Sequence, residues 1–223
     1  MATKIAAFEP VPDMPGLYTA IKNNLRCTAI VLQSGEVCLF SPVSGLSDLA
    51  RASLAEIGKV AFLLAPNGYH NGGMAEYATA FPDAAIVASP DMHERLHDRT
   101  GLTFTGLETL RAALPDGTRL ECPAALKNGE TWLIAQSGER CLWHVVDAFG
   151  AQKNSEGRIG NKIRAVKVFP SFAIKDRAEY LVSLKALIAS DPPDILLPCH
   201  GAIAIAANLP EQMQGIYPEL SEK

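Results

Sequence analysis

Three side chains that can bind a metal ion follow three apolar runs of the sequence. They are His70 after Phe62-Leu63-Leu64, Asp147 after Val145-Val146, and His200 after Ile195-Leu196-Leu197-Pro198-Cys199. A glycine follows each of them at once or within a few positions, so the backbone can approach a bound group closely there. Two neutral imidazoles and one carboxylate suit Zn²⁺, Mn²⁺ or Fe²⁺. Open coordination positions on such an ion would activate water for hydrolysis.

The same three residues also fit a simpler interpretation. His70 and His200 could cap turns by hydrogen bonding, and Asp147 could accept hydrogen bonds from backbone N–H groups in its own loop. Residue types and spacing alone leave both interpretations open.

Strands and helices alternate in both halves of the chain, and each half contains a β-hairpin. The expected hairpins pair residues 26–33 with 36–41 and residues 131–135 with 140–146. Further strands are expected at 59–64, 84–88 and 194–199. Helices are expected from Ser47 to Ile57, over 74–81, from Ser89 through Leu96, over 175–189 and from near Asn208. Ligands of α/β folds bind beyond the carboxyl ends of strands, so we expect the three candidate ligands to converge.

This order of elements favours an α/β protein built as a four-layer αββα sandwich, with a single mixed three-layer sheet as the alternative. The 223 residues contain no low-complexity linker, so we expect one domain over residues 1–223. The stretch 152–161 is long enough to form a loop over a site.

Several motifs of this sequence resemble those of a known protein superfamily. The motif Tyr69-His70-Asn71-Gly72-Gly73, the acid Asp147 after a hydrophobic strand, and Leu196-Leu197-Pro198-Cys199-His200-Gly201 resemble the metallo-beta-lactamase-like hydrolase superfamily. The resemblance covers most of the chain. It is closest to a branch with degenerate metal motifs, which is marked here by Ser41-Pro42, Ala65-Pro66-Asn67 and Phe81-Pro82-Asp83-Ala84.

The resemblance implies that one of two metal subsites is lost. The family signature His-x-His-x-Asp-His falls on Ala65, Asn67, Tyr69 and His70, and only the last position keeps its residue. The next family histidine should lie between about Glu121 and Glu130, where this chain has none. The remaining subsite keeps His70, Asp147 and His200. The resemblance therefore implies at most one divalent metal, most simply Zn²⁺, and reduced hydrolysis of a small ester, thioester or lactone-type substrate. The alternative is a non-catalytic relative whose pocket binds a small molecule or is structural.

Two residues of the degenerate signature are candidate pocket residues. Tyr69 could donate a hydrogen bond to a ligand, although filling the vacated space is the simpler role. Asn67 could bind a ligand or form a turn beside Gly68, and the sequence does not choose between these roles.

Three other histidines and one cysteine are expected to lie outside the site. Alternation along a strand points His144 away from Asp147, so we expect a structural or surface residue there. His93 and His97 are four residues apart on an expected helix, a spacing that could bind a metal; because no third ligand lies nearby in the sequence, we expect a solvated helix face instead. Cys199 should point away from His200 into the core.

Composition excludes several classes of function. The formal net charge is −4 and no Lys/Arg cluster is present, which argues against a nucleic-acid partner. The N-terminal residues argue against secretion, and we expect no membrane-spanning segment, because no apolar run has the necessary length. Five cysteines without a Cys-x-x-Cys pair are typical of buried thiols in a reducing compartment, so we expect a cytoplasmic protein, with a homo-oligomer possible. Gly-x-Ser-x-Gly, Gly-x-Gly-x-x-Gly and phosphate-loop motifs are absent.

Overall fold

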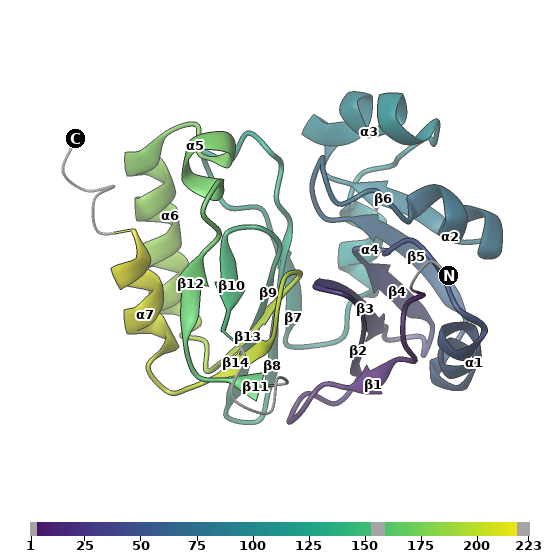
Figure 1. Cartoon of the computed structure of the whole chain (residues 1–223), viewed down its shortest axis with the longest axis horizontal. Helices are drawn as coiled ribbons and strands as arrows, with labels where there is room; N and C mark the ends of the chain where they lie inside the picture. The colour runs from purple at the N-terminus through teal and green to yellow at the C-terminus, as the bar shows by residue number, and fades with distance from the viewer. Residues whose placement is uncertain (1–3, 153–158, 218–223) are drawn as a thin grey trace. The chain divides into compact units, whose positions relative to one another are not determined.

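A computed structural model describes residues 4–152 and 159–217 of the chain. It contains two compact units, the first ending at Thr118 and the second beginning at Arg119. Each unit has one six-stranded sheet with its own helices (Figure 1). Within the described ranges, no helix is long and apolar enough to cross a membrane. The middle of the predicted 152–161 loop, residues 153–158, lies outside the described residues.

The sheet of the first unit follows chain order, from β1 to β6. Its strands are β1 (Glu9–Pro10), β2 (Leu17–Lys22), β3 (Leu25–Val31), β4 (Val37–Phe40), β5 (Val60–Ala65) and β6 (Ala85–Ala88). Strands β1 to β4 are antiparallel neighbours, whereas β5 and β6 run parallel to β4. The predicted hairpin of β3 and β4 is confirmed; β1 and β2 were not predicted. The carboxyl ends of β4 and β5 consequently lie at the same edge of the sheet.

The described residues of the first unit form four α-helices, and the local sequence explains where the first begins and where the third ends. They are α1 (Asp48–Ile57), α2 (Met74–Ala80), α3 (His93–Thr100) and α4 (Glu108–Ala113), and a 3₁₀ turn (Pro90–Met92) precedes α3. The Ser47 hydroxyl accepts a hydrogen bond from the Ala50 N–H and caps α1. Gly101 ends α3 in the left-handed conformation, with φ of 70°. The predicted helix from Ser89 thus starts as a 3₁₀ turn and continues past Leu96.

One face of this sheet packs against the helices to form the core of the first unit. Its buried side chains include Cys27, Ala29, Leu39 and Leu63 from the strands, and Ala50, Leu54, Met74, Tyr77 and Leu96 from the helices. Helical spacing predicts that Leu49 shares one apolar face of this helix with Leu54 and Ile57, and this prediction is wrong for Leu49, because its side chain is 72% exposed. Ala50 and Leu54, which are four residues apart, form the buried stripe instead.

The second unit has the sheet order β11-β14-β13-β9-β8-β7, with β10 and β12 forming a separate two-stranded antiparallel sheet. The strands are β7 (Thr118–Glu121), β8 (Trp132–Ser137), β9 (Arg140–Val145), β10 (Phe149–Ala151), β11 (Ile159–Gly160), β12 (Ile163–Ala165), β13 (Ile195–Pro198) and β14 (Ile203–Ile205). The predicted hairpin of β8 and β9 is confirmed. Strand β13 pairs in parallel with β9, which brings their carboxyl ends together.

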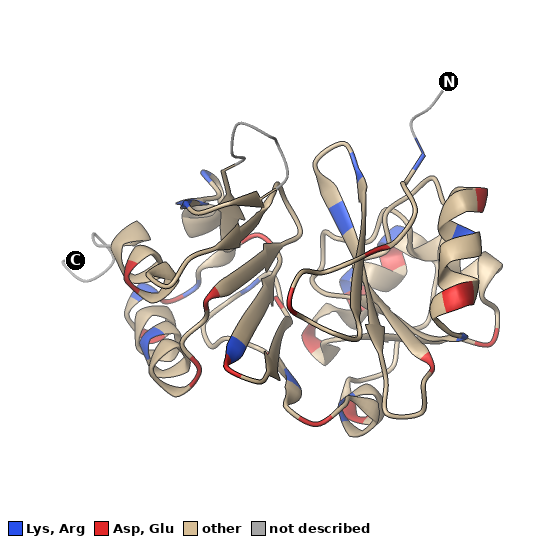
Figure 2. Cartoon of the chain, turned by 90° about the horizontal axis from the view of Figure 1, so that it is seen from below, with Lys and Arg blue, Asp and Glu red and all other residues tan. Residues whose placement is uncertain are grey.

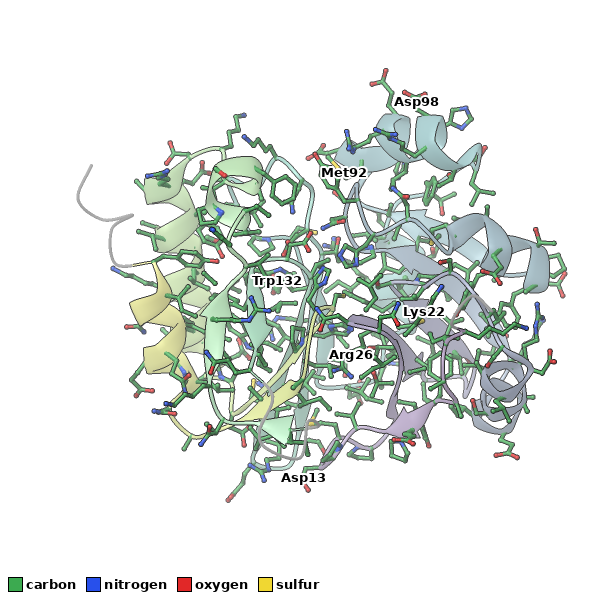
Figure 3. The ribbon with its side chains drawn as sticks, in the orientation of Figure 1. Asp13, Lys22, Arg26, Met92, Asp98 and Trp132 are labelled. Carbon is green, nitrogen blue, oxygen red and sulfur yellow. The ribbon has the colours of Figure 1, made fainter. Side chains whose placement is uncertain are left out.

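Helices and aromatic rings cover this second sheet. The helices are α5 (Phe169–Ala173), α6 (Arg177–Ser190) and α7 (Leu209–Ile216). Buried rings of Trp132, Phe149, Phe169, Tyr180 and Tyr217 contact one another with centroids about 6 Å apart. Figure 3 labels Trp132 among the strands of this unit. Phe149, the first residue of β10, places the end of the short loop after β9 in this aromatic cluster.

Asp191 joins the end of α6 to the sheet of the second unit. Its carboxylate accepts hydrogen bonds from the Arg119 guanidinium, at 2.6 and 3.1 Å, and from Gln136 Nε2 at 2.8 Å. The Arg119 guanidinium holds the pKa of Asp191 below its usual range. This network lies near the amino end of β13, away from the end that leads to His200.

The structure tests two expectations that came from composition, namely the absence of a basic cluster and the burial of the five cysteines. Acidic and basic side chains are interspersed along the described ribbon of each unit (Figure 2). Four cysteines are buried as expected, but Cys122 is exposed, so the expectation of five buried thiols is wrong for this residue.

Two adjacent glycines, Gly72 and Gly73, precede α2, and the backbone around Pro42 comes so close to Gly73 that a side chain has no room there. A Cβ atom on Gly73 would lie 2.5 Å from the Pro42 carbonyl oxygen and 2.8 Å from the Val43 carbonyl carbon. A Cβ atom on Gly72 would meet no atom within 4 Å. An alanine substitution at Gly73 can therefore be compared with the same substitution at Gly72 as a control.

We expect Gly73→Ala to lower the free energy of unfolding by about 1–3 kcal/mol, because the backbone around Pro42 must move to admit the methyl group. Gly72→Ala should change it by less than about 0.5 kcal/mol. Urea unfolding of both variants measures the difference. Equal midpoints for Gly73→Ala and wild type would contradict the close approach.

Candidate metal centre

Asp147 and His200 meet beyond the ends of two adjacent parallel strands. Val145 at the end of β9 pairs with Pro198 at the end of β13, and the Cys199 N–H donates to the Val145 carbonyl at 2.9 Å. His200 Nε2 lies 2.9 Å from Asp147 Oδ1. Two of the three predicted ligands are therefore in direct contact, as the strand-end argument predicts.

Gly201 makes room for the turn that carries His200. This glycine has φ of 94°, and a Cβ atom on it would lie 2.9 Å from the Ala151 carbonyl oxygen. A left-handed conformation and a close backbone contact both favour glycine here. The His200 turn thereby packs against β10, the strand that begins two residues after Asp147.

His70 belongs to the first unit, where it follows the carboxyl end of β5. Its Nδ1 atom lies 3.0 Å from the hydroxyl oxygen of Ser41, the residue after β4. Ser41 is buried and has a left-handed φ of 58°. The Ser41 N–H donates to the Leu64 carbonyl of β5 at 3.0 Å. Two neighbouring strand ends thus fix one ring nitrogen of His70. Its convergence with Asp147 and His200 stays a prediction.

Asn67 organises the loop that carries His70. Its Oδ1 atom accepts hydrogen bonds from the backbone N–H groups of Tyr69, at 2.9 Å, and His70, at 2.8 Å. The side chain is fully buried. Of the two roles that the sequence left open for Asn67, these contacts support turn formation.

Tyr69 lies on the surface of its unit. Its side chain is 47% exposed, and the guanidinium carbon of Arg95 from α3 is 4.1 Å from the ring centroid. Arg95 Nε also donates to the Gly68 carbonyl at 3.1 Å. The cation–π contact holds the ring against α3. Tyr69 therefore does not fill a buried space, contrary to the simpler expectation for this residue.

The other histidines contact the backbone or lie in the core. His93 Nε2 is 3.2 Å from the Ala88 carbonyl oxygen, and His97 Nδ1 is 3.0 Å from the Leu102 carbonyl oxygen. His97 is exposed, whereas His93 is half-buried. His144 on β9 and Cys199 are fully buried, and burial of Cys199 was predicted.

Sequence reasoning missed Glu130, a buried carboxyl next to the Asp147 loop. Glu130 is 1% exposed, and its Oε1 atom accepts a hydrogen bond from the Asp147 N–H at 2.8 Å. Burial raises the pKa of Glu130 above its usual range, and the nearby charge of Asp147 raises it further. The available signal was an acid placed between Asn128-Gly129 and the apolar strand from Trp132. Ser41 was also missed as a partner of His70, although Ser41-Pro42 stood out as a motif.

Searches for relatives give matches at the level of structure. No protein-family model matches this sequence, and no curated protein matches it either. The structure of DIM-1 metallo-beta-lactamase matches 98% of this chain and 99% of its own, with a TM-score of 0.65 and 7% identity. A metallo-beta-lactamase from Erythrobacter litoralis matches 95% of this chain and 96% of its own, with a TM-score of 0.64 and 16% identity.

A third match is a longer protein. Rubredoxin oxygen:oxidoreductase from the anaerobe Desulfovibrio gigas has a TM-score of 0.69 and 13% identity, and the match covers 97% of this chain but 62% of that one. Matches over nearly the whole chain confirm the predicted fold class. This chain is a metallo-beta-lactamase-fold protein.

Proposed function

We propose that this chain is a metal-dependent hydrolase that holds one divalent cation with His70, Asp147 and His200. The proposed substrate is a small ester, thioester or lactone-type molecule. Zn²⁺ is the proposed metal, because two imidazoles and one carboxylate form a typical catalytic zinc set with a position open to water.

The contact between Asp147 Oδ1 and His200 Nε2 carries this proposal. These atoms are 2.9 Å apart. Ligand atoms of a tetrahedral zinc with bonds of about 2.0–2.1 Å lie about 3.3 Å from one another. The two groups therefore need only a small adjustment to bind the same ion.

Ser41 prepares His70 for the same role. A neutral imidazole that donates from Nδ1 to the Ser41 hydroxyl presents the lone pair of Nε2 to a cation. Metal-binding histidines commonly have their second nitrogen fixed in this way. Ser41 is thus a positioning residue in the proposal, and the third ligand comes from the first unit.

The proposed chemistry follows from the cation and the one acid that remains beside it, Asp147. A bound divalent cation lowers the pKa of a coordinated water and polarises a carbonyl oxygen. The position where the family has a carboxylate is Tyr69, which is held against Arg95. Because that carboxylate is missing, the site has one acid, Asp147, to orient the water, and we propose slow turnover.

A specific observation favours a second candidate, a non-catalytic protein whose pocket binds a small molecule or is structural. The 2.9 Å contact between His200 and Asp147 is also a good hydrogen bond. Two side chains that form a hydrogen bond with each other do not need a cation between them. Metal binding therefore separates the two candidates.

The wild-type protein is expected to bind close to one Zn²⁺ per chain by elemental analysis and chelator competition. His70→Ala should weaken binding by more than about 100-fold, since changes to groups around the ligands alone cost about 10–100-fold. His97→Ala, at an exposed histidine of the same unit, is the control. Unchanged affinity in His70→Ala would refute the convergence of the three ligands. No uptake by wild type would refute the metal site.

Hydrolysis of a panel of a nitrophenyl ester, an acyl thioester and a small lactone should stop after chelation and return on adding Zn²⁺. Asp147→Asn should abolish it, because the variant loses the charged ligand. Asp194→Asn, at the other end of β13, should remain active. A protein that binds zinc stoichiometrically yet hydrolyses none of the panel would favour the binding role.

Ser41→Ala is expected to weaken Zn²⁺ affinity about tenfold, because His70 loses the partner that fixes its ring. Ser53→Ala removes a half-buried hydroxyl that accepts from the Phe8 N–H in the same unit, so it tests for general loosening. Wild-type affinity in Ser41→Ala would show that the ring is oriented by other contacts.

A further inference from the structure

Glu130 is a buried acid that the proposed function does not use. It lies two residues before β8, and only 1% of its surface is exposed. Its neighbours in the chain are buried or half-buried on both sides. A carboxyl group in such a place costs free energy unless several hydrogen bonds compensate for the lost water.

Three N–H donors satisfy this carboxyl group. Oε1 accepts from Asn128 Nδ2 at 3.1 Å and from the Asp147 backbone N–H at 2.8 Å. Oε2 accepts from Trp132 Nε1 at 2.6 Å. Both oxygens are therefore occupied by donors from the second unit, so Glu130 is a supporting group and not a further metal ligand.

The bond to the Asp147 N–H fixes a short loop. Strand β9 ends at Val145, and β10 begins at Phe149. On the far side of Asp147, the Ala148 carbonyl accepts a hydrogen bond from Tyr217 Oη at 2.5 Å. Side chains thus hold the backbone on both sides of the Asp147 carboxylate, and they determine where that carboxylate lies relative to His200.

We propose that Glu130 is a positioning residue that fixes the Asp147 backbone so that its carboxylate meets His200 and the cation. The inference rests on the proposed function where it concerns metal affinity. Its geometric part, the restraint on Asp147, concerns the metal-free protein as well. A carboxyl group suits this place because its two oxygens offer about four acceptor sites to three donors.

The first test compares two truncations of buried carboxylates in the second unit. Glu130→Ala removes the acceptors beside Asp147, and Asp191→Ala removes the acceptors of the Arg119 network. Both should lower the thermal midpoint. Only Glu130→Ala should weaken Zn²⁺ binding, by about 10–100-fold. Glu130→Gln keeps a carbonyl oxygen for the Asp147 N–H, so it should recover most of the affinity.

Two results of this comparison would overturn the proposal. One is a Glu130→Ala variant that binds Zn²⁺ as tightly as wild type. The other is an Asp191→Ala variant that loses as much affinity as Glu130→Ala, which would reduce the effect to general destabilisation.

Amide hydrogen exchange tests the restraint without metal. The Asp147 N–H should be protected in the wild-type protein to about the same degree as the Cys199 N–H, which donates to the neighbouring Val145 carbonyl. Glu130→Ala should speed exchange at Asp147 at least about tenfold relative to Cys199. If wild type binds no zinc but shows this selective change, the metal function fails and the positioning role stands.

The wild-type measurement decides the matter even if Glu130→Ala does not fold. Rapid exchange of the Asp147 amide in wild type, at the rate of an exposed loop, would overturn the proposal. Equal acceleration at Asp147 and Cys199 in a folded Glu130→Ala would also overturn it.

Discussion

The parallel pairing of β9 with β13 is the constraint on which the candidate site depends. It places Val145 beside Pro198, so the chain leaves both strands at one edge and carries Asp147 and His200 into contact. An antiparallel pairing would send these residues to opposite edges. Gly201 and the hydrogen bonds around Asp147 then determine the local conformation of the two residues that this strand pairing brings together.

Buried polar side chains support two of the three candidate ligands, through the backbone of His70 and Asp147 and through the ring of His70. Ser41 and Asn67 serve His70, and Glu130 serves Asp147. These supporting groups are all buried. A loop residue bound in this way loses less freedom when it takes up a ligand, because the ordering has already occurred on folding. In the proposed function, the supporting residues would contribute by ordering the ligands and would not themselves bind the cation.

Much of the fold could be predicted because its signals are local. The two predicted hairpins, the Ser47 cap and the end of α1 at Ile57 each depend on residues that are close together in the sequence. The predicted burial of Leu49 was wrong because helical spacing alone does not say which of two adjacent residues faces the core. Strand β2 was missed because its run mixes Lys22 and Thr19 with apolar residues, and its pairing with β3 stabilises it.

The candidate site was predicted only in its outline. Asp147 and His200 could be paired because each ends an apolar strand, a pattern visible in the sequence. Glu130 could not be connected to Asp147, since its partners depend on how β8 and β9 pair and on how the next loop turns. Ser41 and His70 are 29 residues apart and meet through the register of β4 with β5, which no local pattern reports.

The contact of Tyr217 with Ala148 also bears on how the protein is made. The hydroxyl lies 69 residues after the carbonyl that it binds. During synthesis the loop around Asp147 leaves the ribosome long before α7 and Tyr217 do. The loop around Asp147 therefore gains this hydrogen bond only after the chain through Tyr217 has been synthesised.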